Sequence, residues 1–231
     1  MPHVKEQVSL NYLYADLLYT IGGLAVILVV LALGFVDMGL IRRKSVLDTW
    51  IQKLTAGLIA GGATIFGGYA IWQWSFNQAF GVDQPLWQAI KDWWIGGQFQ
   101  TTFAGNIDAK VLPEADVLQV FVVFFATFSM ATMALIHSGV PERLKARPLF
   151  VMSVVIGLVL SPLVAYFCWG PVGPLTNRGT HDFDGIFPLY IFSGTWVLVL
   201  AWRLRPRLGA LAPHASGTAP KTSNMGLVAV G

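Results

Sequence analysis

The stretch that decides the fold is LLYTIGGLAVILVVLALGFVDMGLI, which runs from Leu17 to Ile41 and is apolar except for Asp37. A helix of about 20 residues, rising about 1.5 Å per residue, crosses the roughly 30 Å hydrocarbon core of a bilayer. This stretch is too long for the apolar region of a signal peptide, and no small-residue cleavage site follows it. Three basic residues, 42–44, come directly after it instead. We therefore expect a first membrane span.

The composition of the whole chain agrees with a membrane protein. The 231 residues are 55% hydrophobic and only 12% charged, whereas soluble domains are typically about 45–50% apolar and about 25% charged. So few charges leave too little polar surface to face water on all sides. We expect an all-α integral membrane protein.

Four further apolar stretches predict four more spans, and the second of these five spans is rich in glycine, with the close-approach pattern Gly57-xxx-Gly61. We expect spans at about 17–41, 54–74, 117–136, 149–169 and 186–202, within a membrane domain of residues 1–209. Residues 210–231 would form a tail in which 213–224 is a flexible loop. The ending, 223–231, looks like the first turns of a sixth span.

The basic residues are distributed unevenly between the two sides. The segments after spans one, three and five, with Lys53 included, hold eleven of the fifteen Lys and Arg residues, and the opposite side holds four. The positive-inside bias therefore predicts that the N-terminus is outside and the C-terminus cytoplasmic. The net charge of +3 is thus a topology signal, and we expect no nucleic-acid partner.

The outer segment between spans two and three is long and rich in tryptophan. A short amphipathic helix around Pro85–Ile95, lying in the membrane interface, is the interpretation that we prefer to a ligand site. Asp37 is a functional candidate because carboxylates are rare inside spans. Near the helix end, an ion pair with Arg42 and Arg43 is the simpler account.

Nothing in the chain predicts an enzyme. The single cysteine, Cys168, excludes an internal disulfide and is best read as a packing residue. The four histidines lack metal-ligand spacing, so we expect no metal and no cofactor; His137 and His181 are read as structural. We find no nucleophile–base set and no phosphate-binding loop.

Several segments, in order, resemble the ammonium transporter (Amt/Mep/Rh) family. They are GLIRRKSVL at 39–47, FFATF at 124–128 with SGVPER at 138–143, VAYFCWG at 164–170 and DFDG at 182–185. No one of these segments is specific alone, but their order across five spans carries the resemblance. It covers nearly the whole chain and only the first half of the family's fold.

The resemblance implies a fold and a site. Family members have eleven spans, with spans one to five and six to ten related as inverted repeats around a pore, and they form trimers. By resemblance, Trp169 holds an ammonium ion at the outer vestibule, Phe124 and Phe128 gate the entrance, and Asp182 orders the site. From the residues alone, Trp169 could equally be an interfacial tryptophan, the phenylalanines packing residues, and Asp182 a helix N-cap.

The main departure from the family is Tyr190, which stands at the position of the first channel histidine. A tyrosine, with an unperturbed pKa of about 10, cannot relay protons near neutral pH. Phe192 and Ile186 also depart from the pattern, and they suit a filled, closed former pore. The second channel histidine would belong to the other half.

Two functions follow as hypotheses. The first is an ammonium transporter-like protein of half length, dependent on partner chains and non-conducting. The alternative is a structural or accessory transmembrane subunit of a larger complex, without transport of its own. We expect the partners to be the lipid bilayer, other transmembrane chains (a homo-oligomer or a larger complex) and ammonium or ammonia. We expect a bacterial inner membrane as the location.

Overall fold

The computed structural model describes residues 10–112, 114–204, 206 and 224–231. Within these residues every regular element is helical, and five helical runs are long and apolar enough to cross a membrane. They are Asn11–Leu40, Arg43–Ala79, Ala115–Ser138, Ala146–Trp169 and Ile186–Arg203. The prediction of an all-α protein with five spans is confirmed. Of the predicted flexible loop, 213–224, residues 213–223 lie outside the described residues.

Two spans are single helices and three contain a π-helical segment. The single helices are α1 (Leu10–Leu40) and α6 (Ala115–Ser138). The other spans are built from η1 (Arg43–Ser45), α2 (Val46–Ala63), η2 (Thr64–Gly68) and α3 (Tyr69–Ala79); from α7 (Ala146–Val155), η4 (Ile156–Leu160) and α8 (Ser161–Trp169); and from η6 (Ile186–Ile191) and α9 (Phe192–Arg203). The π-helical segments are η2, η4 and η6. Such segments are rare and often mark functional sites.

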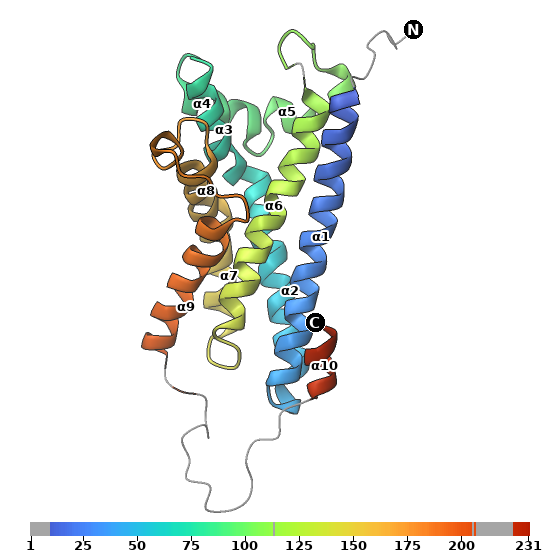
Figure 1. Cartoon of the computed structure of the whole chain (residues 1–231), viewed down its shortest axis with the longest axis vertical. Coiled ribbons are helices and arrows are strands. Elements are labelled where there is room, and N and C mark those ends of the chain that lie inside the picture. The colour runs from blue at the N-terminus through green and yellow to red at the C-terminus, as the bar shows by residue number, and fades with distance from the viewer. Residues whose placement is uncertain (1–9, 113, 205, 207–223) are drawn as a thin grey trace, which may run out of the picture.

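The bundle has two distinct ends (Figure 1). At one, here called the loop end, the short helix expected around Pro85–Ile95 is present as α4 (Pro85–Trp93), followed by α5 (Gln98–Thr101). At the other, the basic end, an ion pair of 2.7 Å between Arg42 and Glu142 joins the turn after α1 to the turn after α6. The short α10 (Met225–Val230) packs beside the basic end of α1 and runs in the opposite direction to it.

The helical run that contains the second span begins at Arg43, whereas the expected start of the span is near Leu54. Lys53 therefore lies inside α2 and is not a loop charge. Its side chain is completely buried. The positive-inside argument for orientation therefore rests on the other ten basic residues of that side.

Close approach of backbones holds the centre of the bundle together. A Cβ atom added at Gly61 would collide with Met130 of α6, and one added at Gly157 would collide with the backbone of Ala60. Beside this crossing, the Thr64 hydroxyl lies 2.7 Å from the Ser129 hydroxyl and 2.8 Å from the Gly157 carbonyl oxygen. These contacts give packing and hydrogen bonding between spans where the lipid supplies no hydrophobic driving force.

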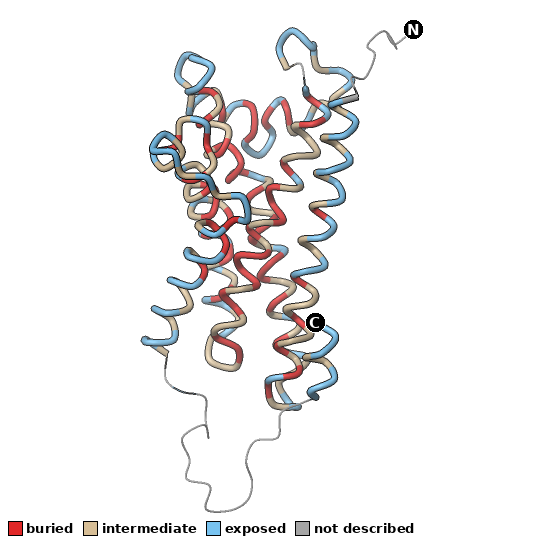
Figure 2. Tube along the Cα trace, in the orientation of Figure 1, coloured by how far each residue is buried: buried red, intermediate tan, exposed pale blue. Residues whose placement is uncertain are grey.

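Burial differs strongly between spans (Figure 2). We compare the most apolar 18-residue segment of each span. In the third span 61% of that segment is buried, against 17% in the first span and 17% in the fifth. Helix α6 is therefore the core helix of the bundle. Helices α1 and α9 present broad apolar faces to the lipid or to further spans.

Candidate functional site

A ladder of aromatic rings lies between α6 and the end of α8. Phe124 and Phe128 are four residues apart and so share one face of α6. Their ring centroids are 4.9 Å apart at 89°, and the Trp169 ring meets Phe128 at 5.5 Å and 74°. Both pairs have the edge-to-face geometry that aromatic rings favour. The structure thus brings together three of the residues to which the resemblance assigns a vestibule role.

Asp182 is attached to this ladder by its backbone. The Trp169 indole N–H donates to the Asp182 carbonyl oxygen at 3.1 Å. The Asp182 carboxylate accepts instead from the amides of Ile186 (2.7 Å) and Phe187 (3.1 Å). These are the first amides of η6, which have no intrahelical partner. Asp182 therefore caps η6 from four residues upstream while its peptide unit fixes the tryptophan.

Replacing Asp182 with alanine is expected to lower the free energy of unfolding by about 1 kcal/mol, because both capping acceptors are lost. Asp182→Asn should cost less, since its amide oxygen keeps one acceptor. Denaturant unfolding of the detergent-solubilised variants measures both. Equal losses in the two variants would show that the charge, and not the cap, accounts for the effect.

Tyr190 does not fill the space between the spans of this chain. Its side chain is 58% exposed, and that of Ile186 is 50% exposed. Pro188, Leu189 and Ser193 are the buried residues of this segment, so they form its inward face and Tyr190 lies on the outward one. Only Phe192 packs inside, against one of the buried clusters. The expectation that these residues fill a former pore stays a prediction, because that pore would run between this chain and a second set of spans.

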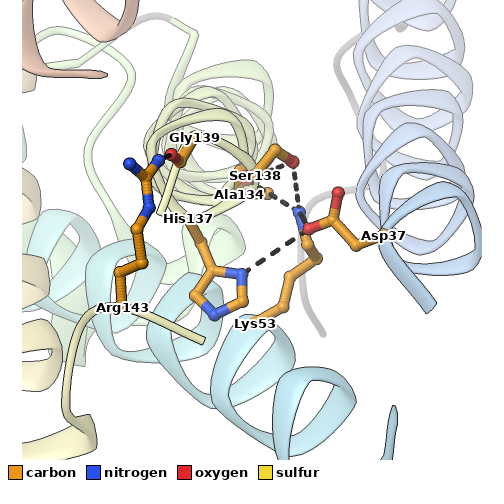
Figure 3. A network of polar contacts seen from close by, with 7 residues as sticks. All are labelled: Asp37, Lys53, Ala134, His137, Ser138, Gly139 and Arg143. Carbon is orange, nitrogen blue, oxygen red and sulfur yellow. Dashed lines mark hydrogen bonds and ion pairs between the residues drawn. The ribbon is translucent and has the colours of Figure 1, made fainter. Parts of the chain in front are cut away.

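A buried charged network lies toward the basic end, where α1, α2 and α6 meet (Figure 3). The Lys53 ammonium nitrogen is 2.9 Å from Oδ2 of Asp37. It also donates to the Ala134 carbonyl oxygen at 2.8 Å and to the Ser138 hydroxyl at 2.6 Å. Nδ1 of His137 is 3.7 Å from the same Asp37 oxygen, too far for a hydrogen bond.

The expected pairing of Asp37 with Arg42 and Arg43 is wrong. Arg42 pairs with Glu142 instead, and Asp37 is only 5% exposed, which keeps its carboxylate away from the membrane surface. Lys53 reaches it because α2 returns alongside α1 and the lysine stem extends across the gap.

Sequence reasoning missed Lys53, although the chain carries a signal for it. Thr49, Lys53, Gly57 and Gly61 recur every four residues, and all four are buried. They therefore share one helix face with the glycine pattern that predicts close packing. A lysine on such a face has to find partners inside the bundle.

No group of three or more His, Cys, Asp or Glu residues that could hold a metal occurs within the described ranges. The aromatic ladder and the charged network offer different chemistry. The ladder of Phe124, Phe128 and Trp169 presents aromatic surface. The network presents the Asp37 carboxylate and neutral oxygens around the Lys53 ammonium group. Both suit cations, the first through the ring quadrupole and the second through hydrogen bonds.

Comparison with known proteins decides the family. The model of the Ammonium Transporter Family matches residues 17–231. The chain belongs to the ammonium transporter family. Among its relatives, a putative ammonium transporter of Methanothermobacter thermautotrophicus is 30% identical over 78% of this chain and 41% of its own length. Ammonium transporter 3 of Schizosaccharomyces pombe is 26% identical over 97% of this chain and 41% of its own length.

This family member spans about two fifths of the length of those relatives. The relatives are transporters and not enzymes by name, and they come from archaea and yeast. The match includes the aromatic ladder, Asp182, Tyr190 and the charged network. As a member of this family with five apolar spans, the chain is an integral membrane protein.

Proposed function

We propose that the chain is an ammonium transporter-like half unit, and that Trp169 forms its ammonium-recognition site at the loop end. The observation that carries this is how Trp169 is held: Phe128 packs against its ring and Asp182 accepts its N–H, yet the ring stays partly exposed. A fixed, accessible indole face attracts a small cation. The bilayer and ammonium are then the immediate partners.

A half unit needs a second set of spans, from the same polypeptide or from partner chains. The outward faces of α1 and of η6–α9 support this, because both are apolar and mostly exposed. Tyr190 lies on the second of these faces, where a family pore would run between repeats. Since this position carries a tyrosine where the family pattern has a histidine, we propose that proton-coupled conduction is absent.

The alternative is an accessory subunit of a larger membrane complex. The same exposed face favours it, since Leu198 and Trp202 of α9 are 70% and 82% exposed and give a partner helix apolar contacts. The two proposals differ at Trp169, because a scaffold needs no cation-binding ring.

The test is binding of labelled methylammonium to the full chain in lipid nanodiscs, with uptake into vesicles measured in parallel. We expect saturable binding that weakens by about 5–30-fold in Trp169→Leu, the loss of one cation–π contact. Trp202→Leu is the matched control and should bind as the wild type does.

Absence of saturable binding would favour the accessory subunit. Robust uptake by vesicles that contain this chain alone would contradict the need for a second set of spans. Each result is read against Trp202→Leu, which loses an indole of the same size from the exposed face of α9.

A further inference from the structure

The Lys53 head group sits in a cup of oxygen atoms that matches an ammonium ion. An –NH₃⁺ group has three N–H donors and no acceptor. Here three oxygens surround the nitrogen, from Asp37, Ala134 and Ser138, at 2.9, 2.8 and 2.6 Å; the Ala134 carbonyl and the Ser138 hydroxyl accept hydrogen bonds, and the Asp37 carboxylate forms an ion pair. They come from two elements, α1 and α6, that do not carry the lysine (Figure 3). The lysine stem only delivers the nitrogen to a cup that other helices build.

We propose that this cup is a site for a primary ammonium group or a free ammonium ion, and that Lys53 is its tethered occupant. The cup carries one negative charge, from Asp37, so it requires one positive charge to be neutral. It is buried, since Lys53 is 0% and Asp37 5% exposed, and an unpaired carboxylate there would be costly. In the native chain, Lys53 thus supplies the positive charge and occupies the cup.

The neighbouring arginines have other partners and do not contact the oxygens of the cup. Arg42 is engaged by Glu142, and Arg143 donates to the Gly139 carbonyl oxygen, on the other side of the α6 terminus in Figure 3. Nδ1 of His137 is buried without a hydrogen bond and faces the Asp37 oxygen from 3.7 Å. His137 is therefore the neighbour that competes for Asp37 if the cup is emptied.

The chemistry of the cup separates ammonium from other cations. Calcium takes six to eight oxygen ligands and magnesium an octahedral set, whereas this cup supplies three oxygens and one charge. Two hydrogen-bond acceptors and an adjacent carboxylate suit the N–H bonds and the positive charge of ammonium and methylammonium. Potassium and sodium have no such donors, and they serve as comparison ions.

The proposal is independent of the vestibule and of conduction. All test variants therefore carry Trp169→Leu, which removes the proposed binding at the loop end. Within that background, Lys53→Ala empties the cup, and Asp37→Asn with Lys53→Ala removes its charge as well. Gln52→Ala, one residue from Lys53 and partly buried, is the matched control.

The experiment measures the melting temperature of each detergent-purified full chain in sodium, potassium, ammonium or methylammonium chloride at equal ionic strength. We expect ammonium and methylammonium to raise the melting temperature of Lys53→Ala by roughly 5 °C over sodium when the cation is in large excess of its Kd. The control and the variant that also lacks the Asp37 charge should show no such difference.

An equal response of Lys53→Ala to sodium and ammonium would overturn the proposal, because it would show that the emptied cup collapses or is taken by His137. Should Lys53→Ala fail to fold in sodium, its yield of folded protein is compared between membranes solubilised in sodium and in ammonium. Recovery in ammonium alone supports the site, and equal failure in both refutes it.

Discussion

Lys53→Met is expected to lower the free energy of unfolding by about 3–5 kcal/mol, because it leaves the Asp37 carboxylate buried without its main partner. Lys53 is completely buried, and its nitrogen makes two hydrogen bonds and one ion pair, all inside the bundle. Methionine keeps the length of the stem and removes only the charge and the donors. Unfolding of the detergent-solubilised chain by a denaturing detergent measures the loss.

Two further variants test the cause. The double variant Asp37→Asn with Lys53→Met removes both charges and should recover most of the loss, since apolar replacement of a buried pair is often neutral. Lys91→Met, which removes an exposed lysine of α4, should change stability by less than about 0.5 kcal/mol. If Lys53→Met is as mild as Lys91→Met, the ion pair contributes little to the fold.

Gly157→Ala is expected to cost about 3 kcal/mol, at the upper end of overpacking effects. The added methyl group would collide with backbone atoms of Ala60, which cannot rotate away as a side chain can. Moving η4 outward would also break the hydrogen bond between the Thr64 hydroxyl and the Gly157 carbonyl oxygen. The same unfolding measurement reports the loss.

Gly62→Ala is the matched control within the neighbouring span. A Cβ atom at Gly62 would meet nothing within 4 Å. Alanine is favoured over glycine in helices by about 1 kcal/mol, so this variant should be neutral or more stable. Opposite signs for the two substitutions would confirm that backbone contact is the cause, and a mild effect at Gly157 would contradict the close crossing.

The number of spans could be predicted because length and hydropathy alone decide it. A stretch such as 17–41 has no other stable arrangement in a chain with 12% charged residues. The start of span two could not be predicted in the same way. Lys53 looks like a membrane boundary by charge, and its burial is made tolerable by Asp37, Ala134 and Ser138 across the helix interfaces.

Some contacts of the candidate site could also be predicted from the sequence, and others could not. Phe124 and Phe128 share a face by helical geometry, so their contact follows from spacing. The contact of Trp169 with these rings depends on how α8 packs beside α6, and helical spacing does not predict that packing. Only the family resemblance places Trp169 near the two phenylalanines. The outward position of Tyr190 within this chain could not be predicted, because the burial of Pro188 and Leu189 fixes the rotation of η6.

The pair of Asp37 and Lys53 also constrains how the protein is made. A charged residue inside an isolated span is costly to insert, by about 2.5–3.5 kcal/mol at the span's centre on insertion scales, and Asp37 of α1 and Lys53 of α2 are both buried. If the two helices leave the translocon together as a hairpin, each charge enters the bilayer already neutralised by the other. The α6 carbonyl and hydroxyl that complete the cup are synthesised later. Biogenesis would then proceed by pairs of helices, with the first two spans committed before the third arrives.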